Sequence, residues 1–77
     1  MNKIFADVVL HVKEKIEFVQ RNVLVDEISS LEGVKSVSNL DKRSHLYLVR
    51  YDSIAVASKD ILSTTRARGW SASIIGL

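Results

Sequence analysis

Two histidines, His11 and His45, carry the only imidazoles of this chain, and the sequence contains no cysteine. Without a thiolate, the chain has no disulfide, no cysteine nucleophile and no Cys-based metal site. A two-histidine site for Zn²⁺ or Ni²⁺ would need further ligands such as Glu14 or Asp41. Histidines that lie unrelated on strands or at the surface are the more ordinary interpretation, so we expect no tight transition-metal site.

Catalysis needs a nucleophile, a base and an orienting group within reach of one another in a pocket. The serines of this chain fall mostly in predicted turns, at a helix start or on the last strand, and neither histidine has an evident partner. Glycine is found only at Gly33, Gly69 and Gly76, so no glycine-rich phosphate loop is present. We therefore expect no catalytic residue, no enzyme activity and no cofactor.

Length and composition predict one small globular domain over residues 1–77. The chain has a mass of 8.6 kDa, with 47% hydrophobic and 26% charged residues and a net charge of +2. This mildly basic charge does not by itself imply a nucleic-acid partner. No segment approaches the roughly 20 apolar residues that span a bilayer, and Asp7 interrupts the short apolar stretch after Lys3. A cytoplasmic setting without membrane contact is the expectation.

Alternating and helical periodicities divide the chain into six elements. Residues 5–12 and 45–51 alternate like strands, and apolar residues recur every three or four positions between residues 16 and 31. The expected order is strand 5–12, helix 16–31, strand 34–40, turn 41–44, strand 45–51, helix 58–68 with Ser58 as N-cap, and strand 70–77. This order predicts an α+β, ferredoxin-like βαββαβ fold, a four-stranded antiparallel sheet with two helices on one face.

Between Leu24 and Val37 the residues read L-x-x-x-I-x-x-L-x-G-V-x-x-V. Further matches are Val49-Arg50-Tyr51-Asp52, Ala57-Ser58-Lys59-Asp60-Ile61 and Gly69-Trp70-Ser71-Ala72. In this order and spacing, from about Val8 to Ile75, the chain resembles heavy-metal-associated domains. These are the copper-chaperone modules that also stand at the N-termini of heavy-metal-transporting P-type ATPases.

The chain departs from that family at the metal site. The family binds its metal on M-x-C-x-x-C, and counting back from Gly33 places the two cysteine positions at Glu17 and Gln20. A soft ion such as Cu(I) prefers thiolates, whereas these side chains offer oxygen. The resemblance therefore implies a degenerate member without the thiolate metal site, acting as a protein-interaction or regulatory module in metal homeostasis. One implied setting is the N-terminal domain of a metal-transporting P-type ATPase, and a module that binds metal through His and carboxylate ligands is the alternative.

An RNA-recognition motif has the same fold and stacks bases on outward aromatic residues of its central strands. Here the outward positions are Leu46 and Leu48 on the third strand and Val9 and His11 on the first. Aliphatic side chains have no π-face for a base, so we expect no nucleic-acid partner.

The open face of the predicted sheet should carry an aliphatic patch. Its expected residues are Val9, Leu46 and Leu48, flanked by His11, Arg50 and Ile75. Burying three such side chains contributes a few kcal/mol at about 25 cal/mol per Å², which suits a protein partner or a weak homodimer. Scattered surface aliphatics are the alternative interpretation.

Overall fold

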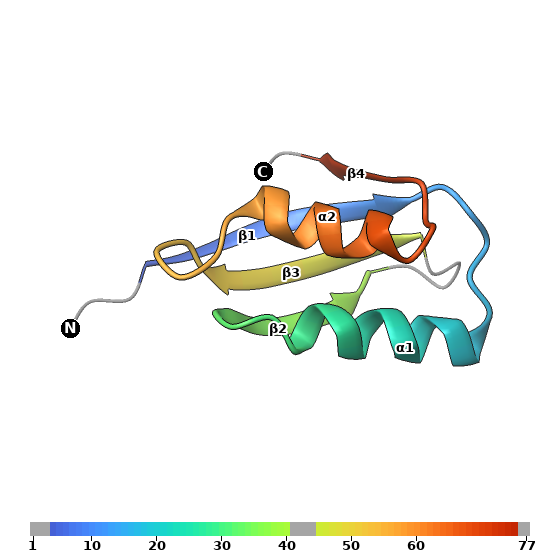
Figure 1. Ribbon diagram of the computed structural model, residues 1–77, viewed down its shortest axis with the longest axis horizontal. Coiled ribbons are helices and arrows are strands. Elements are labelled where there is room, and N and C mark those ends of the chain that lie inside the picture. Colours follow the sequence, from blue (N-terminus) through green and yellow to red (C-terminus); the bar gives the residue numbers. More distant parts are fainter. Residues whose placement is uncertain (1–3, 41–44, 76–77) are drawn as a thin grey trace.

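A computed structural model describes residues 4–40 and 45–75 of the chain (Figure 1). Six elements follow one another in the order that the periodicity predicts. They are β1 (Phe5–Val12), α1 (Phe18–Ser29), β2 (Val34–Asn39), β3 (Leu46–Asp52), α2 (Ser58–Ala67) and β4 (Ala72–Ile75). The predicted turn at residues 41–44 lies outside the described residues.

The four strands form one antiparallel sheet in the order β2-β3-β1-β4. Both helices pack on the same side of this sheet, in front of the strands in Figure 1. The ferredoxin-like fold predicted from the sequence is confirmed. No helix among the described residues has the length and apolar character needed to cross a bilayer.

The strand register decides which residues face the helices. Leu10 of β1 is paired with Tyr47 of β3 and with Ile74 of β4, and this layer faces the core. Side chains alternate between the two faces of a strand, so Val9 and His11 face the opposite side. The core comprises Val8, Leu10, Val12, Ile16, Leu24, Ile28, Tyr47, Val49, Tyr51, Val56, Ile61 and Ala72.

Helix α1 is shorter at both ends than the expected span of residues 16–31. Its N-cap is Glu17, in extended conformation, and Ile16 is buried in the core from the preceding loop. The hydrogen bond from Leu31 N–H to the Ile28 carbonyl spans only three residues, so the last turn tightens after Ser29. Gly33 has a positive φ, 98°, and lies in the turn into β2.

Other boundaries also differ from the sequence expectation by a residue or two. β2, β3 and α2 end at Asn39, Asp52 and Ala67 rather than at residues 40, 51 and 68. The N-cap of α2 is Ala57 rather than Ser58, because the Asp60 carboxylate accepts a hydrogen bond from the Ala57 N–H at 3.1 Å. β3 begins at Leu46 rather than His45, and β4 begins at Ala72 rather than Trp70. Gly69, with φ of 91°, ends the turn after α2.

Candidate functional site

The sheet face away from the helices brings the predicted contact residues together. Val9 of β1 is paired with Leu48 on one side and with Ile75 on the other, and His11 is paired with Leu46. Val9, Leu46 and Leu48 are partly buried by their neighbours, whereas Ile75 is 46% exposed. We call Val9, Leu46, Leu48 and Ile75 the aliphatic row.

An ion pair lies beside the aliphatic row on the same face. Arg50 of β3 stands opposite Asp7 of β1, with Nε 3.0 Å from Oδ1 and Nη2 3.3 Å from Oδ2. The hydrogen bonds that Arg50 donates to Asp7, together with the negative charge of Asp7, raise the pKa of Arg50 above its ordinary value. Since both groups are solvent-exposed to some degree, the pair contributes little to stability, but its two charges balance each other beside the row.

Glu17 and Gln20, at the positions where the resemblance puts the metal ligands, lie at the start of α1. The Glu17 N–H donates a hydrogen bond to Oε1 of Gln20 across 3.4 Å. Both side chains are exposed. Their geometry is that of a helix cap, in which the third helical residue satisfies the N–H of the cap residue.

The two histidines meet at one end of the central strands. Their rings stack with centroids 6.3 Å apart, and Nδ1 of His45 lies 2.8 Å from the carbonyl oxygen of Val12. A carbonyl oxygen only accepts, so this contact places a proton on Nδ1. Across residues 4–40 and 45–75, no group of three or more His, Cys, Asp or Glu side chains gathers in a metal-binding arrangement.

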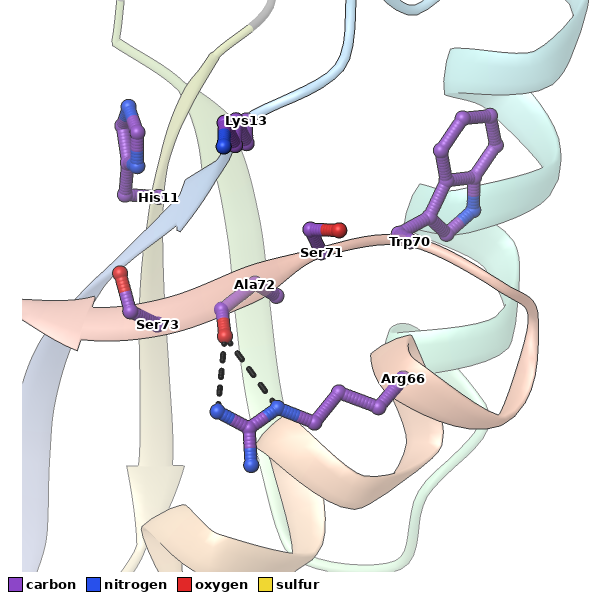
Figure 2. Close-up of a pocket in the computed structure, with 7 residues that line it drawn as sticks. All are labelled: His11, Lys13, Arg66, Trp70, Ser71, Ala72 and Ser73. Atoms are coloured by element: carbon purple, nitrogen blue, oxygen red, sulfur yellow. Dashed lines mark hydrogen bonds between the residues drawn. The ribbon is translucent and has the colours of Figure 1, made fainter.

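A hollow of about 630 Å³ lies where β1 ends and β4 begins (Figure 2). Sequence reasoning did not assign it, because it joins residues about 60 positions apart. It is lined by His11, Lys13, Arg66, Trp70, Ser71, Ala72 and Ser73. We call it the basic hollow.

Two side chains hold the rim of the basic hollow in place. Arg66 donates from Nε and Nη2 to the carbonyl oxygen of Ala72, at 3.2 and 3.0 Å, and so satisfies a backbone acceptor of edge strand β4 (Figure 2). Glu14 accepts a hydrogen bond from the Ser71 N–H at 2.7 Å. Hydrogen bonding to Ser71, first to its side chain and then to this backbone N–H, lowers the pKa of Glu14 below its ordinary value.

Sequence reasoning also missed an apolar surface on α1. Phe18, Val19 and Val23 are 65%, 71% and 48% exposed, more than the residues of the aliphatic row. A groove of about 180 Å³ runs beside Val19 and Val23 and reaches Trp70. The signal was present in the sequence, because apolar residues stand on all sides of this helix rather than on one stripe.

Comparison with known proteins supports the fold. No sequence-family model matches the chain, and no curated protein is found as a relative. Solved structures do match. Oxidized MerP from Ralstonia metallidurans CH34 superposes with a TM-score of 0.82 at 20% identity, over 92% of this chain and 97% of that chain.

Two further structures match over nearly their whole length. The putative copper-ion-binding protein from Bacillus anthracis str. Ames has a TM-score of 0.83 at 21% identity, over 94% of this chain and 100% of that chain. A copper binding domain from HMA7, a P-type ATPase, has a TM-score of 0.81 at 18% identity, over 91% and 93%. The chain therefore has the fold of heavy-metal-associated domains, as the resemblance between Leu24 and Ala72 implies.

Proposed function

We propose that this chain is a non-catalytic interaction module that acts by protein contact through its open sheet face. The observation that supports this most directly is the aliphatic row, which crosses three strands on the face opposite α1 and α2. Apolar side chains gathered on an uncovered face indicate a contact surface. The absence of cysteine removes the thiolate site on which this fold otherwise relies in the resembling family.

The proposed setting is metal homeostasis, in the cytoplasm. The matching structures are named as MerP, a putative copper-ion-binding protein and a copper binding domain of a P-type ATPase. A domain of this fold without the thiolates would regulate or scaffold such a system rather than transfer its metal. One proposed placement is the N-terminal domain of a metal-transporting P-type ATPase.

The partner that the face fits is a second copy of this chain. In a two-fold symmetric contact, residue i meets residue j while j meets i. Within β1 and β3, the open face carries the acid Asp7 and the base Arg50, which are already paired with each other. When two copies bring these faces together, neither charge is left unpaired, because Arg50 of one copy can approach Asp7 of the other.

The small size of the aliphatic row sets the strength of this contact. Four partly exposed aliphatic side chains contribute a few kcal/mol at about 25 cal/mol per Å². A stable complex buries about 800 Å² on each partner, far more than this row alone provides. We therefore expect a reversible dimer with a dissociation constant of about 0.1–1 mM.

Sedimentation equilibrium and NMR dilution over that concentration range test the proposal. Leu48→Glu places a charge in the centre of the row, and Ile75→Lys does so at a more exposed position. Val19→Glu is the matched control, because Val19 is 71% exposed on α1 and Glu suits the first turn of a helix. Circular dichroism confirms that each variant is folded.

The expected result is a concentration-dependent mass for the wild-type chain that both row variants abolish and Val19→Glu leaves unchanged. A wild-type chain that stays monomeric throughout the range contradicts the proposal. Loss of association in Val19→Glu alone also contradicts the proposal, because it would show that the contact lies on the apolar surface of α1.

A further inference from the structure

The basic hollow is built from cross-strand pairs at one end of β1 and β4. His11 is paired with Ser73, and the Lys13 N–H donates to the Ser71 carbonyl at 2.8 Å, which makes Lys13 and Ser71 the next pair. In Figure 2 these four side chains gather around the hollow, with the indole of Trp70 beside them. Each of the four can donate a hydrogen bond from its side chain.

The charges around the hollow favour an anion. The ion pairs of the described residues join Asp7 to Arg50 and Glu27 to Arg68, so Lys13 has no carboxylate within ion-pair distance there. Arg66 adds a second positive charge, fixed at the rim by its two hydrogen bonds to Ala72.

The negative charge of Glu14 partly offsets the positive charges of Lys13 and Arg66. Glu14 is close enough for Lys13 to contribute to its lowered pKa, and its Oε1 is committed to the Ser71 N–H. With His11 neutral, the groups around the hollow sum to one positive charge.

We propose that the basic hollow binds a small oxyanion of the phosphate or carboxylate class. A charge-assisted hydrogen bond from Lys13 supplies the attraction, and the hydroxyl of Ser73 orients the oxygens. A metal ion fits less well, because it needs several lone-pair donors and the nearest carboxylate already accepts a backbone N–H. None of the four residues of the aliphatic row lines this hollow, so anion binding does not depend on self-association.

The test is a titration of the full chain with sodium phosphate and, separately, with sodium acetate, followed by ¹⁵N–¹H NMR. Sodium chloride keeps the ionic strength constant, so that general screening does not produce the signal. We expect saturable shifts at residues 11–14 and 66–73, with a dissociation constant in the millimolar range, as an exposed site with one net charge implies. Saturation by phosphate alone identifies a phosphate site, and saturation by acetate identifies a carboxylate site.

Three variants separate the hollow from general surface charge. Lys13→Gln removes the central cation and should weaken binding about fivefold or more. Glu14→Gln removes the opposing charge and keeps an oxygen for the Ser71 N–H, so it should tighten binding about twofold. Lys35→Gln is the control, because Lys35 is exposed on β2 at the opposite edge of the sheet and should change nothing.

Two results overturn the inference. One is the absence of saturable shifts with either anion. The other is equal weakening by Lys13→Gln and Lys35→Gln, which would show nonspecific attraction to the net positive charge. Because the readout is a local shift in the monomer, it is unaffected by the outcome for Leu48→Glu.

Discussion

The backbone N–H of Glu17 donates a hydrogen bond to the side-chain oxygen of Gln20, three residues further along the chain. The same arrangement opens α2, where the Ala57 N–H donates to Asp60. In both helices the third helical residue satisfies a backbone donor that no helical carbonyl reaches. The two positions at which the resemblance places metal-binding thiolates therefore serve as a helix cap in this chain.

Restoring thiolates at this cap should restore soft-metal binding. We expect the double substitution Glu17→Cys and Gln20→Cys to bind Cu(I), because two thiolates at a helix start suit a soft cation. Loss of the cap should cost about 0.5–1 kcal/mol of stability. Competition for Cu(I) against a chromophoric chelator measures the gain.

The control for this prediction carries the same spacing elsewhere on α1. Asp26→Cys with Ser29→Cys places two exposed thiols three residues apart, near the C-terminal end of the helix. If this control pair binds Cu(I) as tightly as the cap pair, the position of Glu17 and Gln20 has no special significance for metal binding.

The wild-type chain should bind Zn²⁺, Ni²⁺ and Cu²⁺ only weakly. His11 and His45 supply two imidazoles with ring centroids 6.3 Å apart, and the described part of the chain adds no third ligand of the usual kinds to them. A closed zinc site uses four ligands. Isothermal titration calorimetry should show no site tighter than micromolar, and a tight site that His11→Ala abolishes would refute this expectation.

Gly33 and Gly69 form a matched pair for measuring a steric clash. Both have positive φ, at 98° and 91°, so alanine at either position is strained by about 1 kcal/mol. A Cβ at Gly33 would lie 2.8 Å from the Cβ of Ala55 and 3.1 Å from Cγ1 of Val56, whereas a Cβ at Gly69 meets nothing within 4 Å.

Gly33→Ala should therefore destabilise the chain more than Gly69→Ala, by about 1–2 kcal/mol, because overpacking adds to the strain. Urea unfolding of the two variants beside the wild type measures the difference. An equal loss of stability in the two variants would mean that the turn containing Ala55 moves away from the new Cβ at position 33 without a cost in free energy.

Strand alternation made the sheet and its two faces predictable from the sequence. Burial alternates along β1 and β3, and the two-residue period of a strand places Leu48 and Arg50 on the face opposite Tyr47 and Val49. The helix starts were less predictable, because Gln20 and Asp60 cap from inside the helix while the preceding residues are not typical N-caps. The pattern of apolar and polar residues does not indicate that a side chain inside the helix will accept a hydrogen bond from the backbone N–H of the cap residue.

The basic hollow was out of reach of sequence reasoning for a different reason. Lys13 and Ser71 are neighbours only because β1 pairs with β4, and their register depends on a backbone hydrogen bond between the two segments. Ile16 shows the same limit, since it enters the core from a loop where periodicity has no meaning. Contacts set by tertiary pairing appear only once the chain is folded.

The hydrogen bond between Glu14 and Ser71 should make part of the stability depend on pH. It lowers the pKa of Glu14 in the folded chain relative to the unfolded chain. The contribution is therefore fully present above the unfolded-state pKa and is lost as the pH falls through the folded-state pKa. Glu14→Gln removes this titration, so its loss of stability between pH 7 and pH 3 should be smaller than that of the wild type.

Urea unfolding at several pH values measures this loss, and ¹³C NMR of the Glu14 carboxyl gives the folded-state pKa directly. A carboxyl that titrates above its ordinary value, or an acid-side slope unchanged in Glu14→Gln, would show that the bond to Ser71 does not hold the β1–α1 loop against β4 in solution.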